Sequence, residues 1–156
     1  KIAWALENKP RHQWKGMDFA TQAESIRQLT EKYNVEYIGI DATGLGIGVF
    51  QLVRSFYPAA RDIRYTPEMK TAMVLKAKDV IRRGCLEYDV SATDITTSFM
   101  AIRKTMTSSG RSATYEASRT EEASHADVAW ATMHALLNEP LTAGSGQVTS
   151  SILEFN

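Results

Sequence analysis

Apolar residues recur along this chain in two alternating patterns, which predict a succession of short strands and longer amphipathic helices. The clearest strand covers residues 35–40 and is apolar and β-branched, as is typical of a strand covered on both faces. A shorter strand is predicted for residues 63–66. Weak strand patterns also lie on either side of Pro10, at residues 1–6 and 11–15.

Five helices are predicted, over residues 19–33, 49–56, 68–83, 93–104 and 124–138. Asp18 is expected to cap the first, and Pro67 and Gly84 to begin and end the third. Residues 86–88 are expected to be extended, and residues 105–108 and 113–117 flank a turn sequence that predicts a β-hairpin. Strands that alternate with helices predict an α/β domain with a mixed sheet, followed by the hairpin and the last helix.

Composition narrows the class of protein. A chain of 156 residues is about the length of one domain, and its 18 basic and 18 acidic residues give a formal net charge of zero. Binding through bulk positive charge is therefore excluded, although a local basic groove is compatible with this composition. The single cysteine, Cys85, fits a reducing cytosolic setting.

Targeting and membrane signals are not found in the sequence. No run of about 18 apolar residues is present, so no membrane span is predicted. The first residues lack the layout of a signal peptide and begin abruptly in strand-like sequence, so we expect a piece of a larger protein. A domain over residues 1–141 and a flexible tail over residues 142–156, rich in Gly, Ser and Thr, are predicted.

Asp41 is the first candidate for chemistry because it ends the clearest strand and precedes a glycine turn. In open α/β sheets the carboxyl ends of the strands form the crevice that binds ligands. A carboxylate placed there needs a metal, a hydrogen-bond network or a substrate. Two interpretations stay open: an Asx-type hydrogen bond to the amide of Thr43 or Gly44, or a role as metal ligand or general base.

The glycines that follow Asp41 do not complete a nucleotide-binding motif. The fingerprint G-x-G-x-x-G needs glycine or alanine where Val49 stands, and no suitable acidic residue follows on a later strand. The chain also contains no G-x-x-x-x-G-K-[ST] sequence. A nucleotide-binding module is therefore a weak alternative.

The second candidate is the sequence Ser124-His125-Ala126-Asp127, which begins the last predicted helix. Ser124 and Asp127 have the spacing of a capping-box variant, and an acidic residue suits the first turn of a helix. The alternative is that Asp127 faces the same crevice as Asp41 and that His125 acts as a proton shuttle or a ligand. A carboxylate bound to a metal is not free to cap, so the two interpretations agree only in part.

The third candidate is a group of basic residues on and before the predicted hairpin, namely Arg103, Lys104, Arg111 and Arg119. Most such groups are ordinary solvated surface. The functional interpretation is a strip that contacts phosphates, where each contact makes binding more sensitive to salt.

The other distinctive side chains have structural interpretations. Trp130, Met133 and His134 are expected in the core, and Cys85 is expected to be a small buried apolar residue.

Four segments together resemble a known family: Tyr37-Ile-Gly-Ile-Asp41-Ala-Thr-Gly-Leu-Gly46, Lys76-Ala-Lys-Asp-Val-Ile-Arg-Arg-Gly84, Ser98-Phe-Met-Ala-Ile-Arg103 and Ser124-His-Ala-Asp127-Val-Ala-Trp-Ala131. Asn138-Glu-Pro-Leu141 belongs to the same pattern. These segments look like the C-terminal nuclease domain of the large terminase subunit of tailed bacteriophages and prophages. The resemblance extends from about Trp14 to Leu141 and is specific only in combination.

The resemblance implies an RNase H-like fold and metal-dependent cleavage of double-stranded DNA. Members of that family cut concatemeric genomes during packaging in the cytoplasm of the bacterial host. A separate N-terminal ATPase domain drives translocation, and a small terminase subunit and a portal ring are partners.

The active site of that family gathers acidic residues around two divalent ions, Mg²⁺ or Mn²⁺. Asp41 matches the acid after the central strand, Asp127 matches the acid at the start of the last helix, and His125 stands where related domains place a histidine. Carboxylates suit such cations, and two ions together can activate water and stabilise the leaving oxygen of a phosphodiester.

One part of the family pattern is missing. The family has a further acid on its first strand, but residues 1–13 offer only Glu7, which does not match that strand. The sequence therefore predicts an endonuclease domain whose first strand is missing or replaced. A non-catalytic module that docks to DNA or to the portal ring is the alternative.

Overall fold

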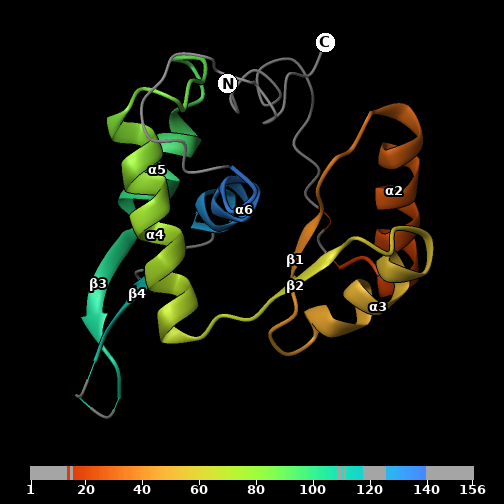
Figure 1. The fold of residues 1–156 in the computed structure, drawn as a ribbon, viewed down its shortest axis with the longest axis horizontal. Helices are drawn as coiled ribbons and strands as arrows, with labels where there is room; N and C mark the ends of the chain where they lie inside the picture. The colour runs from red at the N-terminus through yellow and green to blue at the C-terminus, as the bar shows by residue number, and fades with distance from the viewer. Residues whose placement is uncertain (1–13, 15, 109, 111, 118–125, 140–156) are drawn as a thin grey trace. The chain divides into compact units, whose positions relative to one another are not determined.

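The computed structural model describes residues 14, 16–108, 110, 112–117 and 126–139. These residues fall into two compact units, one spanning Pro10–Tyr65 and the other beginning at Thr66 (Figure 1). We call them the first and the second unit and describe each by itself. The predicted segments 1–6 and 142–156, the boundary at 141 and nearly all of segment 11–15 lie outside the described residues.

The first unit is a strand–helix–strand motif preceded by a helix. Its elements are α2 (Phe19–Lys32), β1 (Gly39–Asp41), α3 (Gly46–Phe56) and β2 (Arg61–Ile63). The strands are parallel, with Gly39 opposite Arg61 and Asp41 opposite Ile63. Helices α2 and α3 lie side by side (Figure 1). This motif places Asp41 at the carboxyl end of its strand.

Helix α2 begins where the sequence predicts. The Asp18 side chain accepts a hydrogen bond from the Thr21 amide at 2.9 Å, which confirms it as the helix cap. One apolar face of the helix packs into a core built around Val53, which is fully buried, together with Ala23, Val49, Phe50 and Ala60. Burial of this face ties α2 to α3.

Strand β1 is shorter than the predicted segment 35–40 because its partner is short. Bonds from Arg61 N to Ile38 O and from Ala42 N to Ile63 O, both 2.9 Å, mark the two ends of the pairing. Strand β2 is also displaced from its predicted segment, 63–66: it begins at Arg61 and ends at Ile63. The Thr66 side chain instead accepts from the Met69 amide at 3.2 Å and caps the next helix.

Within the described residues, the second unit contains three helices and a hairpin: α4 (Pro67–Arg82), α5 (Thr93–Met100), β3 (Ile102–Met106), β4 (Ala113–Ala117) and α6 (Ala126–Leu136). Helix α6 packs against both α4 and α5, and β4 packs against α4 (Figure 1). Pro67 lies at the start of α4, and Gly84 follows its end with φ of 67°, as the sequence predicts.

The helix predicted over residues 93–104 is too long. Helix α5 ends at Met100, and β3 then pairs antiparallel with β4, from Ile102 opposite Ala117 to Met106 opposite Ala113. The backbone bonds of this pairing replace those of another helical turn. Arg103 and Lys104 therefore lie on a strand and not on a helix.

Burial confirms the core residues predicted for the last helix. Trp130, Met133 and His134 are all buried. Cys85, however, is exposed, so its predicted burial is wrong. It directly follows Gly84, where the chain leaves α4, and the segment 86–88 forms no strand.

The α/β class is correct, and the described strands include one parallel and one antiparallel pair. Within the described ranges, none of the helices combines the length and the apolar character needed to cross a membrane.

Candidate functional site

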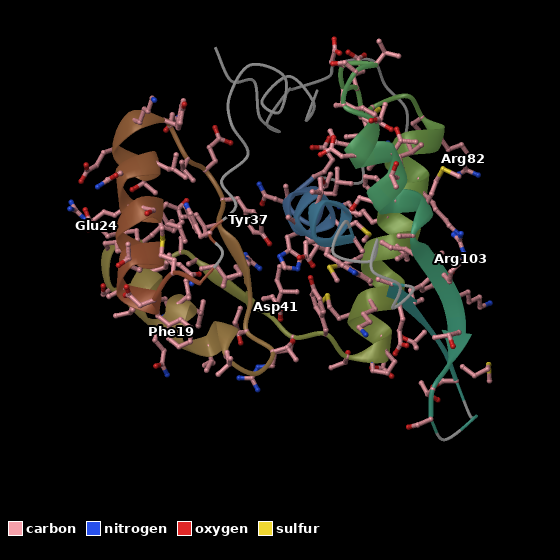
Figure 2. The ribbon with its side chains drawn as sticks, turned by 180° about the vertical axis from the view of Figure 1, so that it is seen from behind. Phe19, Glu24, Tyr37, Asp41, Arg82 and Arg103 are labelled. Atoms are coloured by element: carbon pink, nitrogen blue, oxygen red, sulfur yellow. The ribbon has the colours of Figure 1, made fainter. Side chains whose placement is uncertain are left out.

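Asp41 is held by the turn that follows it. Its Oδ1 accepts a hydrogen bond from the Thr43 amide at 2.8 Å, so the predicted Asx-type contact is present. Among the described residues this is the only hydrogen bond of the Asp41 side chain, and it leaves Oδ2 without a partner. The side chain is half-buried at the end of β1 (Figure 2). Capping and ligand binding are therefore compatible here, because each needs a different oxygen.

Thr43 connects this turn to the segment after β2. Its amide donates to Asp41, and its Oγ1 accepts from the Tyr65 amide at 2.9 Å. The turn also includes Gly44, whose φ of 65° lies in the left-handed region. Two parallel segments are thus tied together beside the carboxylate, which restricts the directions that Asp41 can adopt.

Asp127 lies in the first turn of α6 and is exposed. Its side chain has no hydrogen bond or ion pair within the described residues. A capping role is not tested, because Ser124 lies outside those residues, as does His125. Asp127 is thus an exposed carboxylate, without a hydrogen bond or ion pair among the described residues, on a well-packed helix.

Helix α6 is anchored near both ends by side chains from other helices. Near its start, the amide of Ala129 donates to Ser98 Oγ of α5 at 2.8 Å, inside the protein. Near its end, Lys76 Nζ of α4 donates to the carbonyl oxygen of Glu139. A cation at this end of a helix also opposes the negative end of the helix dipole. Lys76 is therefore a structural residue of the second unit.

The donor chemistry of Asp41 and Asp127 fits hard divalent cations, which prefer carboxylate oxygens. The two residues belong to different units, and each carries at least one oxygen that has no hydrogen bond or ion pair with a described residue. Among residues 14, 16–108, 110, 112–117 and 126–139, no group of three or more His, Cys, Asp or Glu side chains could hold a metal ion.

Two of the four predicted DNA-contacting residues are described, and both are exposed on β3. Successive strand residues point to opposite faces, so Arg103 and Lys104 do not share a face. Arg103 lies opposite Glu116 and donates to the Met100 carbonyl, whereas Lys104 lies opposite Tyr115. Lys104 is thus the more available cation. Arg111 and Arg119 lie outside the described residues.

Lys78 is a basic residue of this surface that the sequence did not indicate. Its Nζ lies 5.5 Å from the centre of the Tyr115 ring, in a cation–π contact between α4 and β4. Lys78, Tyr115 and Lys104 therefore gather from three elements, and we call them the Lys78–Tyr115–Lys104 cluster. Spacing alone cannot reveal it, because 37 residues separate Lys78 from Tyr115 in the sequence.

Two arginines, one on α4 and one on β3, lie outside this cluster, and Arg103 points to the other face of β3 from Lys104. Arg82 and Arg103 extend outward on the same side of the second unit (Figure 2). Arg82 lies 3.3 Å from Asp79 in an exposed ion pair, which partly offsets its charge.

Comparison with known proteins shows the family. Residues 9–139 match the family described as the terminase RNase H-like domain. The match covers most of the chain, so the protein belongs to this family, and its α/β fold is RNase H-like.

Two phage proteins are similar in sequence. The chain is 93% identical over 146 residues to the terminase, ATPase subunit, of Escherichia phage P2, covering 93% of this chain and 25% of that protein. It is 47% identical over 133 residues to the probable terminase, ATPase subunit, of Haemophilus phage HP1, covering 85% of this chain and 22% of that protein. The chain thus spans about a quarter of the length of these relatives.

A solved structure is similar in fold. The large terminase nuclease from thermophilic phage G20c, crystallised with bound cobalt, matches with a TM-score of 0.66 at 16% identity. The match covers 80% of this chain and 64% of that one. At this identity the likeness shows the fold alone.

Proposed function

We propose that this chain is the metal-dependent endonuclease domain of a terminase large subunit, and that it cuts concatemeric double-stranded DNA during genome packaging. Membership of the terminase RNase H-like family supports the assignment. The observation that carries the proposal is at Asp41, whose two carboxylate oxygens differ. Oδ1 accepts the hydrogen bond that holds the turn, and Oδ2 has no hydrogen-bond partner among the described residues.

Asp41 and Asp127 are the residues that would hold Mg²⁺ or Mn²⁺, in a two-metal site like that of the family. The chemistry that such ions supply is Lewis-acid stabilisation of the attacking and leaving oxygens of a phosphodiester. The bound cobalt of the G20c nuclease supports a divalent metal requirement.

The protein's own residues would orient this site and the DNA. Thr43 restricts Asp41, the packing of α6 restricts Asp127, and His125 would assist by moving a proton. Arg103, Lys104, Arg111 and Arg119 would contact DNA phosphates, with Lys78 added to them by its position beside Tyr115. A neutral chain would grip DNA weakly alone.

The names of the relatives support a larger assembly. Both relatives are named as ATPase subunits, and this chain covers about a quarter of each. We therefore place this domain beside an N-terminal ATPase domain in a motor with a small terminase subunit and a portal ring, in the cytoplasm of the bacterial host.

The decisive experiment uses Asp41→Asn and Asp127→Asn in a plasmid-cleavage assay with Mn²⁺. Asparagine at position 41 can still accept from the Thr43 amide, so the turn should survive while the anionic ligand is lost. Both variants should lose cleavage by at least about 100-fold, in line with the loss of a metal-binding group.

The matched control is Asp62→Asn, which changes an exposed carboxylate on the neighbouring strand β2. It should cleave like the wild type. Full activity of either Asp41→Asn or Asp127→Asn would sink the assignment. Salt-sensitive DNA binding without cleavage in the wild type would instead favour the non-catalytic docking module, for which the unmatched first strand of the family pattern argues.

A further inference from the structure

Ser98 occupies an unusual place for a serine. It lies in the interior of α5 and is fully buried, with 0% of its surface exposed. Serine hydroxyls inside helices usually face solvent or bond back to a carbonyl of the preceding turn. Here Oγ instead accepts from the Ala129 amide of another helix, at 2.8 Å. The contact joins α5 to the beginning of α6.

The position of this hydrogen bond on α6 connects it to the candidate site. Ala129 is itself fully buried and lies two residues after Asp127. The Ala129 amide lies in the first turn of α6, so its bond to an acceptor on α5 ties that turn to the neighbouring helix. Asp127 belongs to that turn, and among the described residues its own side chain has no hydrogen bond or ion pair that would orient it.

We propose that Ser98 is a positioning residue for Asp127: its hydroxyl fixes the first turn of α6 and thereby the direction in which the carboxylate is presented. This inference rests on the proposed function of Asp127 as a metal ligand. Side chains that orient metal ligands affect metal affinity without touching the metal. Ser98 differs from a core residue in this respect, because its contribution passes through a single hydrogen bond to the helix of the ligand.

The test is isothermal titration calorimetry with Mn²⁺, which measures the Mn²⁺ affinity of the purified protein. The wild type, Ser98→Ala and Ser98→Thr are compared. Ser98→Ala should weaken Mn²⁺ binding about 10-fold, at the lower end of the effect expected for a group that orients a ligand. Ser98→Thr keeps the hydroxyl acceptor and should bind Mn²⁺ close to wild type. Ile95→Val, which removes a buried methyl from α5 one turn earlier, is the matched control and should leave the affinity unchanged.

A double variant separates positioning from general loss of structure. If Ser98 acts through Asp127, adding Ser98→Ala to Asp127→Asn should change Mn²⁺ affinity no further. Equal Mn²⁺ affinity of Ser98→Ala and the wild type would overturn the inference. So would a 10-fold loss that persists in the Asp127→Asn background.

The Mn²⁺ affinity of Asp127→Asn alone distinguishes a failure of the proposed function from a failure of the inference about Ser98. If Asp127→Asn binds Mn²⁺ as tightly as the wild type, the proposed function of Asp127 fails, and the inference about Ser98 falls with it. If Asp127→Asn loses affinity but Ser98→Ala, folded by circular dichroism, does not, only the inference about Ser98 is wrong.

Discussion

Gly46 lies so close to Asp41 that a Cβ atom on residue 46 would stand 1.8 Å from the Asp41 carbonyl oxygen. This separation is far below any allowed contact, and the atom approached belongs to the backbone. The first residue of α3 is therefore packed directly against the residue that carries the proposed ligand. Glycine is required here for this close approach.

Gly46→Ala should consequently destabilise the first unit and move Asp41. We expect a loss of roughly 1–3 kcal/mol in the free energy of unfolding, the usual cost of forcing extra atoms into a packed site. Gly48→Ala is the matched control, because its Cβ would meet the Phe19 ring at 2.7 Å, and that ring is 40% exposed and can shift. Urea unfolding of both variants measures the difference; equal losses would contradict the backbone clash.

The Lys78–Tyr115–Lys104 cluster predicts how DNA binding responds to salt. Replacing Lys78 or Lys104 by glutamine should weaken binding to every DNA sequence and reduce the salt slope by about one per lost phosphate contact. Fluorescence anisotropy over a range of salt concentrations measures this slope. Arg27→Gln is the control, since Arg27 is already paired with Glu24 at 2.6 Å and belongs to the first unit. An unchanged slope for both lysine variants would exclude the cluster from the DNA-contacting surface.

Asp18 predicts a specific response of stability to acid. The hydroxyl of Thr21 and then its amide hold the pKa of Asp18 below its ordinary value of 3.8. A carboxyl group whose pKa is lower in the folded state stabilises the protein above its unfolded pKa, and this contribution is lost as the pH falls through the folded pKa.

The variant Asp18→Asn isolates this effect because asparagine also caps helices but does not titrate. The unfolding free energy of the wild type relative to Asp18→Asn should be constant well above pH 3.8 and should decrease below it. Denaturant unfolding of both proteins at a series of acidic pH values measures the difference. A difference that grows as the pH falls would contradict the prediction.

Thr114 predicts a stabilising substitution. It is 4% exposed, and its hydroxyl is buried without a hydrogen-bond partner among the described residues. Thr114→Val removes this unsatisfied group and should raise the unfolding free energy by up to about 1 kcal/mol. In the control Thr132→Val the lost hydroxyl donates to the Val128 carbonyl at 2.7 Å, so stability should fall by about 1 kcal/mol. Thermal unfolding compares the two, and a loss at Thr114 would imply a partner for its hydroxyl.

Elements with local signals could be predicted from the sequence. Asp18, Pro67 and Gly84 fix helix ends through bonds to residues a few positions away, and their positions are correct within about one residue. The junction at Met100 could not be predicted, because Ile102 leaves the helical pattern in order to pair with Ala117, 15 positions away. The exposure of Cys85 depends in the same way on the direction the chain takes after Gly84.

In the candidate site, too, features with local sequence signals could be predicted, and contacts between distant segments could not. Asp41 could be identified because a strand, a carboxylate and a glycine turn are adjacent in sequence. The bond between Ser98 and Ala129 and the contact between Lys78 and Tyr115 each join distant segments, so no spacing indicates them. The role of Asp127 as a metal ligand was inferred from the family resemblance, and this assignment stays a prediction.

The anchoring of α6 by Ser98 and Lys76 has a consequence for dynamics. Helix ends usually fray, and their amides exchange with solvent faster than those of the helix centre. A helix anchored near both ends should open mainly together with the surrounding core, so the Ala129 amide should exchange nearly as slowly as that of Met133. The carboxylate of Asp127 would then be carried by a turn that is ordered before any metal or DNA arrives, and binding would not have to offset the entropy of ordering it.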